Sequence, residues 1–286
     1  YFILFCLIGA SLLLSALLGC GRSGVDGNDP VLKVGGIPDQ NAARLARRYE
    51  AFAEYLSQEL GVSVKYVPSV DYAAVVTAFG QNQIQLAFFG GLTGVQARLQ
   101  NPGARVIAQR ETDAQFHSVF IVDADLPINS IDDLQAQAQE LTITFGSESS
   151  TSGHLMPRHF LVQHGMNPDT DFLNEANFSG SHDLTWHLVQ SGSFDVGALN
   201  QEVWDRAVRE GQVDGAKVKE FYTTPAYFDY NWTAQTSLDK IYGDGFTYKV
   251  QAALLNLNTN EGKEILELFN TEKFITSNNA NYQDIE

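Results

Sequence analysis

A run of four hydroxyl residues at 149–152 is the part of this chain whose residue types and spacing most clearly predict chemistry. An alternating apolar run at 141–146 precedes it and predicts a strand, and an apolar run at 155–162 follows and predicts a helix. The first N–H groups of a helix lack intrahelical partners and carry partial positive charge, so this start can bind a small oxyanion without Lys or Arg. Ordinary N-capping is the alternative, and it needs one hydroxyl. The candidate ligand-binding residues here are Ser149, Ser150, Thr151 and Ser152.

Two carboxylates accompany this run in the sequence. Glu148 stands directly before it, and Asp183 follows a second predicted strand, in the segment 179–183. An ionised carboxylate repels a fully ionised oxyanion, but it accepts a strong hydrogen bond from a protonated one. If either side chain points at the ligand, we expect a ligand that retains a proton or an N–H group. Otherwise Glu148 faces solvent, and Asp183 lies favourably in the first turn of a helix.

Strand and helix patterns alternate from residue 31 onward, which predicts an α/β fold with helices on both faces of a mostly parallel sheet. The clearest helix is 42–60, which Gly61 ends. In such sheets ligands lie beyond the carboxyl ends of the strands. The loops at those ends add the candidates Asp39, Gln40, Phe89, Gly90, Gly91, Thr93, His182, Asp183 and Asn200.

These loops are far apart in the sequence and can meet only if two halves of the chain face each other. Extended segments at 110–122 and 222–227 predict the two crossings between such lobes. We therefore expect a first lobe of residues 31–110 plus 225–286 and a second lobe of residues 111–224. Tyr227 and Tyr230 lie in an aromatic segment that we interpret as hinge packing, with ligand contact as the alternative; Tyr227 is kept as a candidate.

The front of the chain predicts export. Residues 1–18 are apolar and uncharged and lead into Leu17-Leu18-Gly19-Cys20, which resembles a lipobox. The resemblance implies cleavage before Cys20 and a lipid on its sulfur. We expect residues 1–19 to be a lipoprotein signal peptide without its basic front, and the Gly-rich residues 20–30 to be a tether. An uncleaved signal anchor and a buried helix are the alternatives.

Composition excludes several classes of function. The net charge of −16 disfavours nucleic acid and anionic lipid as partners. The cysteines are Cys6 and the lipobox cysteine, so we expect neither a disulfide nor a thiolate metal site. No two histidines have metal-pair spacing, and we expect no metal and no cofactor. There is no G-x-S-x-G, P-loop or G-x-G-x-x-G motif, and adjacent His182 and Asp183 make a poor triad with Ser149.

Four segments resemble the periplasmic phosphonate-binding protein family, the substrate-binding subunits of ABC importers. These segments are 37–40, 88–93, 149–153 and 179–183. The chain is most similar to a branch named for selenate binding. The resemblance implies a two-lobe periplasmic binding protein of type II-like fold, with a mixed sheet flanked by helices in each lobe and the ligand in the cleft. It also implies oxyanion binding at 149–152, an imidazole donor from His182, and a permease partner.

The chain departs from the family pattern at two positions. Phe89 stands where the family usually has a tyrosine, and Asn200 where an acid is expected to hold an ammonium group. Both changes favour a small oxyanion without an amine, of the phosphite, phosphonate, selenate, selenite or phosphate type. We expect a monomeric lipoprotein in the periplasm or on the cell surface, anchored to a bacterial membrane through Cys20. The alternative is an oxyanion-sensing lipoprotein that signals to a kinase, and a hydrolase is the weakest alternative.

Overall fold

The computed structural model describes residues 29–257 and 260–286. The predicted signal peptide, Cys20 and most of the predicted tether lie outside the described residues. In the part that is described, no helix combines the length and the apolar character needed to cross a membrane.

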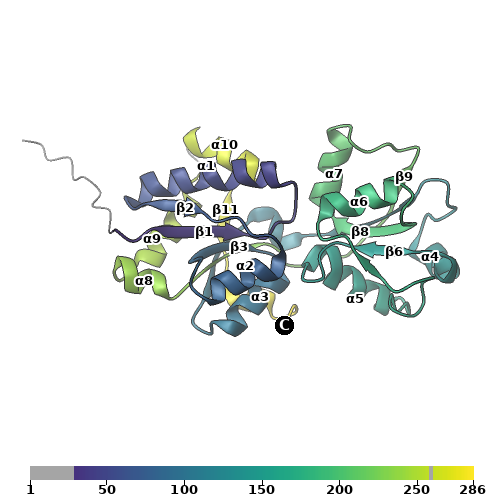
Figure 1. Cartoon of the computed structure of the whole chain (residues 1–286), viewed down its shortest axis with the longest axis horizontal. Helices are drawn as coiled ribbons and strands as arrows, with labels where there is room; N and C mark the ends of the chain where they lie inside the picture. Colours follow the sequence, from purple (N-terminus) through teal and green to yellow (C-terminus); the bar gives the residue numbers. More distant parts are fainter. Residues whose placement is uncertain (1–28, 258–259) are drawn as a thin grey trace, which may run out of the picture.

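The described chain forms two lobes, each built on one sheet (Figure 1). The sheet of the first lobe has the strand order β11-β4-β10-β3-β1-β2. β1 pairs in parallel with β2 and β3, whereas β10 and β11 run antiparallel to their neighbours. Its strands are β1 (Leu32–Gly36), β2 (Val64–Tyr66), β3 (Leu86–Phe89), β4 (Arg105–Arg110), β10 (Asn231–Ala234) and β11 (Phe274–Thr276).

The sheet of the second lobe has the order β7-β6-β8-β5-β9. β6 is parallel to β7 and β8, and β5 is antiparallel to β8 and β9. The mixed sheets that the family resemblance implies are thus confirmed, whereas the mostly parallel sheet predicted from the alternation of strands and helices is wrong. β5 and β10 are the first strands that the chain forms after crossing between lobes, and both run antiparallel to the strands beside them. The strands are β5 (Ser118–Asp123), β6 (Ile143–Phe145), β7 (Asn177–Phe178), β8 (Val196–Asn200) and β9 (Val218–Thr223).

Helices flank both sheets. In the first lobe they are α1 (Ala42–Leu60), α2 (Tyr72–Gly80), α3 (Gly91–Gln100), α8 (Ser237–Tyr242), α9 (Phe246–Leu255) and α10 (Asn260–Leu268). In the second they are α4 (Ile131–Gln137), α5 (Met156–Gln163), α6 (His182–Gln190) and α7 (Gln201–Arg209). The predicted helix 42–60 is confirmed: Asn41 caps its start, and Gly61 ends it at a φ of 66°, a conformation that glycine adopts at no steric cost.

Two segments join the lobes. One runs from the end of β4 at Arg110 to the start of β5 at Ser118, and the other from the end of β9 at Thr223 to the start of β10 at Asn231. The two segments pair with each other through a bridge between Phe116 and Tyr227. Each sheet has its own buried apolar core, and Met156 and Phe160 of α5 in the second lobe also pack against the core of the first.

Candidate functional site

The hydroxyl-rich turn leaves the carboxyl end of β6 and enters a helix whose first turn is π-helical. Ser150 is the N-cap, and its Oγ accepts the N–H of Gly153 at 3.0 Å. Thr151–Leu155 form the π-helical turn, and α5 continues from it. Ser150, Thr151 and Ser152 are all buried. A buried helix start with three hydroxyl groups offers several hydrogen-bond donors in a small volume.

Pro157 explains why this first turn is not regular. Proline has no N–H, so it cannot bond to the carbonyl four residues earlier, which is that of Gly153. That carbonyl instead accepts the N–H of Gly146, at 2.8 Å, and this bond ties the turn to the end of β6. A Cβ on Gly153 would lie 2.9 Å from Ser150 Oγ and 3.0 Å from the ring of His182. Glycine is therefore required where the turn and α6 approach each other.

The turn is bonded to the first lobe directly. Thr151 Oγ1 accepts the N–H of Leu92 at 2.9 Å, across the gap between the lobes. Beside it, Asp229 Oδ1 accepts the N–H of Gly91 at 2.9 Å. Both donors belong to the first turn of α3, so the helix starts of the two lobes meet here. A Cβ on Gly90 would lie 3.1 Å from Thr151 Oγ1, which shows how close the contact is.

Three buried oxygen atoms near this junction have no hydrogen-bond partner within the described parts of the chain. They are Asp39 Oδ1, the hydroxyl of Tyr72 and Asp229 Oδ2. Burial raises the pKa of Tyr72 well above its usual value, with the charge of Asp39 adding to the shift and the Ser150 hydroxyl opposing it. Buried polar atoms are normally paired. Polar atoms buried beside a helix start, two of them next to the hydroxyls of Ser150, Thr151 and Ser152, make this junction the candidate site for a polar ligand.

Burial raises the pKa of Asp229 to about 6, although the N–H of Gly91 and the hydroxyls of Ser152 and Thr151 lower it. A carboxylate with a pKa so close to neutrality binds a proton, or accepts one in a hydrogen bond, far more readily than an ordinary aspartate. The free oxygen of Asp229 is thus suited to a ligand atom that carries hydrogen.

The free oxygen of Asp39 is held in position by a chain of buried side chains. The Tyr230 hydroxyl donates to Asp39 Oδ2 at 2.8 Å and accepts the side-chain amide of Asn200 at 3.0 Å. His182 Nδ1 accepts the backbone N–H of Asn200, and its Nε2 lies 3.5 Å from the Tyr230 hydroxyl. Burial lowers the pKa of His182 to about 4, although Asp39 and Asp183 oppose the shift. At neutral pH this histidine is uncharged, with its proton on Nε2 toward Tyr230.

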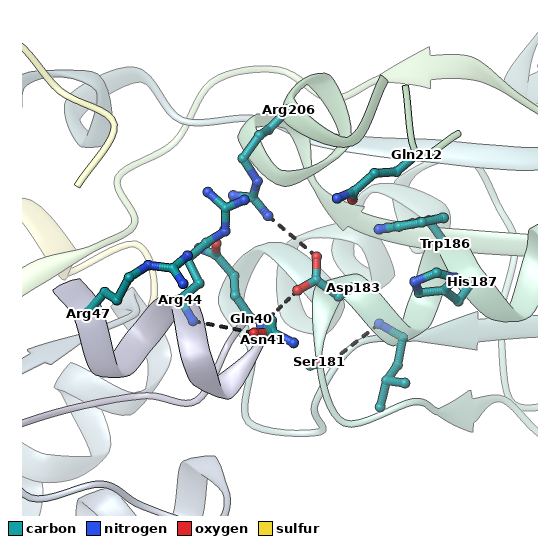
Figure 2. A pocket seen from close by; sticks show the side chains of 11 residues that line it. Gln40, Asn41, Arg44, Arg47, Ser181, Asp183, Trp186, His187, Arg206 and Gln212 are labelled. Carbon is teal, nitrogen blue, oxygen red and sulfur yellow. Dashed lines mark hydrogen bonds and ion pairs between the residues drawn. The ribbon is translucent and has the colours of Figure 1, made fainter. Parts of the chain in front are cut away.

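Other predicted residues lie around this junction without contributing a free polar atom. Gln40 and Asp183 lie at its outer side, where Asp183 Oδ2 accepts the N–H of Asn41 at 2.8 Å (Figure 2). Tyr227 supports the turn from behind, because its hydroxyl pairs with Ser118 Oγ, which donates to the Ser152 carbonyl. The Thr93 hydroxyl bonds to the Gly90 carbonyl.

The structure leaves three of the predicted residues, Glu148, Phe89 and Ser149, outside the junction or at its margin. Glu148 is exposed, and only its backbone carbonyl is used locally, by His154. Phe89 lies in the core of the first lobe with its ring 5.3 Å from that of Phe79. Ser149 is only partly buried and stands before the N-cap. Of the two readings of Glu148 and Asp183, the structure thus has Glu148 facing solvent and Asp183 bonded near the start of α6, and the carboxylate oxygens without a partner at the junction belong to Asp39 and Asp229.

The sequence prediction missed Tyr72 and Asp229. Tyr72 is the first residue of α2 and follows β2, so the rule that selected the other loops points to it as well. Asp229 lies inside a crossing segment that we interpreted as hinge packing. Its role depends on the pairing of the two crossings, which the sequence does not reveal. Within the residues that the structure describes, no group of three His, Cys, Asp or Glu side chains is arranged to hold a metal ion.

Comparison with known proteins decides the family. Residues 34–282 match the model of the periplasmic substrate-binding protein of a phosphonate ABC transporter. The chain belongs to this family. It is therefore a substrate-binding protein of the periplasmic type and not an enzyme.

Several members of the phosphonate-binding family are similar to the chain over most of its length. A probable ABC transporter phosphite binding protein, PhnD1 of Prochlorococcus marinus, is 44% identical over 98% of this chain and 94% of its own. The structure of PhnD1 in complex with methylphosphonate matches with a TM-score of 0.85 and 46% identity, over 89% of this chain and 95% of that one. The phosphonates-binding periplasmic protein of Escherichia coli is 26% identical over 75% of this chain and 65% of its own.

Proposed function

We propose that this protein captures phosphite or a small alkylphosphonate for an ABC importer and holds it between the lobes. The ligand oxygens would accept hydrogen bonds from the helix start at Ser150–Ser152 and from Tyr72. The observation that carries the proposal is the pair of buried carboxylate oxygens without partners, Asp39 Oδ1 and Asp229 Oδ2, beside that helix start.

The two carboxylates restrict the charge state of the ligand. A doubly ionised tetrahedral anion between two aspartates would be repelled, whereas a singly protonated one donates its O–H to a carboxylate in a strong hydrogen bond. Phosphite and methylphosphonate exist partly as protonated monoanions near neutral pH. Sulfate and selenate are fully ionised there. The site is thus better suited to the phosphorus oxyanions than to selenate.

The relatives support this choice of ligand. PhnD1 carries a name that refers to phosphite, and its solved complex contains methylphosphonate. The loss of the family's usual tyrosine at Phe89 is offset by the Tyr72 hydroxyl, which reaches the junction from another element. The side-chain amide of Asn200 donates to the Tyr230 hydroxyl, and its oxygen accepts a backbone N–H from the first turn of α7. It would therefore not bind an ammonium group on the ligand.

We further propose the arrangement of the whole chain. The signal peptide is residues 1–19, Cys20 carries a lipid, and residues 20–30 tether the lobes to a membrane. Residues 31–110 plus 225–286 form one lobe and residues 111–224 the other, acting as a monomer. The predicted boundaries fall in or beside the two segments that join the sheets.

Isothermal titration calorimetry on ligand-stripped protein tests the function. The panel is phosphite, methylphosphonate, aminoethylphosphonate, phosphate, sulfate, selenate and selenite. We expect the tightest binding for phosphite and methylphosphonate, and the weakest for sulfate and selenate at neutral pH. Tight selenate binding without phosphite binding would refute the protonated-ligand proposal. If no member of the panel binds, the proposal of oxyanion capture is refuted.

A further inference from the structure

One face of α7 and its C-cap carry charged residues at a spacing of four, namely Glu202, Arg206 and the C-cap residue Glu210. Residues four apart lie on the same side of a helix. All three contact the first lobe: Glu202 pairs with Arg110 at 2.6 Å, Arg206 Nη1 donates to Gln40 Oε1 at 2.7 Å, and Glu210 pairs with Arg44 at 3.0 Å. We call these three contacts the α7 latch.

The latch joins the two lobes. α7 belongs to the second lobe, whereas all three partners belong to the first. In Figure 1 the N-terminal end of α1, which carries Arg44, faces α7 across the boundary between the lobes. Contacts of this kind exist only while the lobes are closed, so their free energy acts on the closed state alone.

The latch lies outside the oxyanion junction but is connected to it. It borders a cavity of about 540 Å³ at the outer side of the junction (Figure 2). Gln40 directly follows Asp39, and Arg206 also pairs with Asp183, the neighbour of His182, at 3.4 Å. The two residues that Arg206 contacts, Gln40 and Asp183, are therefore next in sequence to residues of the candidate site.

From this geometry we infer that Glu202, Arg206 and Glu210 are positioning residues for ligand capture, which act by stabilising the closed state without touching the ligand. The inference rests on the proposed function. A ligand that contacts both lobes binds fully only to the closed form, so its apparent dissociation constant rises when the closed fraction falls. The latch should thus slow ligand release, which requires opening, more than it affects ligand entry.

The three contacts differ in exposure. Arg44 and Glu210 are 31% and 35% exposed, so this pair is weak and screened by salt. Arg110 is 5% exposed, and the Phe269 carbonyl and Asp113 also fix its guanidinium. The outer pair is the better one to change, because both of its side chains are partly exposed, although Glu210 also lies 4.0 Å from Arg206.

Charge reversal at the outer pair tests the inference. Arg44→Glu faces Glu210 with a like charge, and Glu210→Arg faces Arg44 with one. Each should weaken methylphosphonate binding about threefold to tenfold, mainly through faster dissociation, and should leave the unfolding midpoint of the ligand-free protein unchanged. The double variant restores opposite charges, and we expect its affinity to return toward the wild-type value. Stopped-flow kinetics and calorimetry supply the readings.

Arg105→Glu is the matched control. Arg105 pairs with Asp239 at 3.5 Å with similar exposure, but both residues lie in the first lobe. Loss of affinity in this variant, or equal affinity in Arg44→Glu and wild type, would overturn the inference. If the wild type binds neither methylphosphonate nor phosphite, the proposed function fails. The latch is then judged by X-ray scattering alone: Arg44→Glu should expand the protein, the double variant should reverse this, and an unchanged radius would overturn it.

Discussion

At the scale of single residues, the site combines hydrogen-bond donors from a helix start with carboxylate acceptors. A site made of donors alone would bind any tetrahedral oxyanion of the right size, sulfate and selenate included. In the proposed site, Asp39 and Asp229 would add a requirement for hydrogen on the ligand. Selectivity among oxyanions would thus follow from protonation, because the shapes of these anions are nearly the same.

Asp229→Asn tests the carboxylate directly. Asparagine keeps the oxygen that accepts the Gly91 N–H, but it presents an amide donor where the free carboxylate oxygen lies. We expect methylphosphonate binding to weaken at least about tenfold, which corresponds to roughly 1.4 kcal/mol, and to lose its dependence on the protonated form of the ligand. Calorimetry between pH 6 and 8 measures both effects, and an unchanged pH profile would argue against a proton at this position.

The same substitution should stabilise the ligand-free protein. The pKa of Asp229 is about 6 when folded and 3.8 as a reference, so the folded protein holds a proton that the unfolded chain has lost between these values. Stability therefore falls as pH rises through this window, by up to about 3 kcal/mol. We expect Asp229→Asn to unfold at higher urea concentration than the wild type at pH 7. Equal midpoints would mean that the carboxylate is well solvated.

The contribution of His182 to the pH dependence of stability has the opposite sign. The pKa of His182 is about 4 in the folded protein, and its ordinary value, taken for the unfolded chain, is 6.5. Between these two pH values the unfolded chain binds a proton on this residue and the folded protein does not. The contribution of uncharged His182 to the free energy of unfolding is fully present above pH 6.5. It falls as pH decreases toward 4, by up to about 3 kcal/mol. In His182→Gln, urea unfolding between pH 7 and 5 should show a smaller decrease with acidification. A decrease as large as that of the wild type would exclude His182 as its source.

At the scale of elements, the π-helical turn is the feature that shapes the site. Pro157 leaves the Gly153 carbonyl free for Gly146, and this positions Ser150–Ser152 against the first lobe. Turns of this type are often found at functional sites. The turn thus depends on the absence of an N–H group at residue 157. Any residue other than proline would supply one.

Pro157→Ala should weaken ligand binding although it favours the helix. Alanine provides the N–H that competes for the Gly153 carbonyl, so the first turn can become α-helical and its hydroxyls move. We expect weaker methylphosphonate binding, an unfolding free energy equal to or above that of the wild type, and faster hydrogen exchange at the Gly146 amide. Slow exchange at Gly146 with unchanged affinity would show that the turn does not depend on the proline.

The sequence predicted elements better than contacts between them. The helix 42–60 was predicted to the residue because its apolar spacing and its terminal glycine agree, and the mixed sheets follow from the family. The loops at strand ends were predicted because the carboxyl ends of strands share one edge. Tyr72 and Asp229 were missed because side-chain burial and the pairing of the two crossings depend on contacts between distant residues.

At the scale of the whole molecule, the proposed lipid on Cys20 would keep the two lobes at the membrane that holds the importer. Cys20→Ser tests the proposed attachment. We expect the wild-type protein to sediment with membranes and to carry the added mass of a diacylglyceryl group. The variant should do neither. Soluble wild-type protein that carries no lipid mass would exclude the anchor without affecting the capture of ligand.

Trp186 lies in the second lobe and lines the cavity at the boundary with the first, with its ring centroid 3.6 Å from that of His187 (Figure 2). All three tryptophans are buried, Trp186 and Trp204 in one apolar cluster of the second lobe and Trp232 in the core of the first. Opening of the lobes would change the surroundings of Trp186, because its indole also lines this cavity. Its indole emission is therefore a built-in optical signal of opening and closing, which can be followed in time without an attached dye.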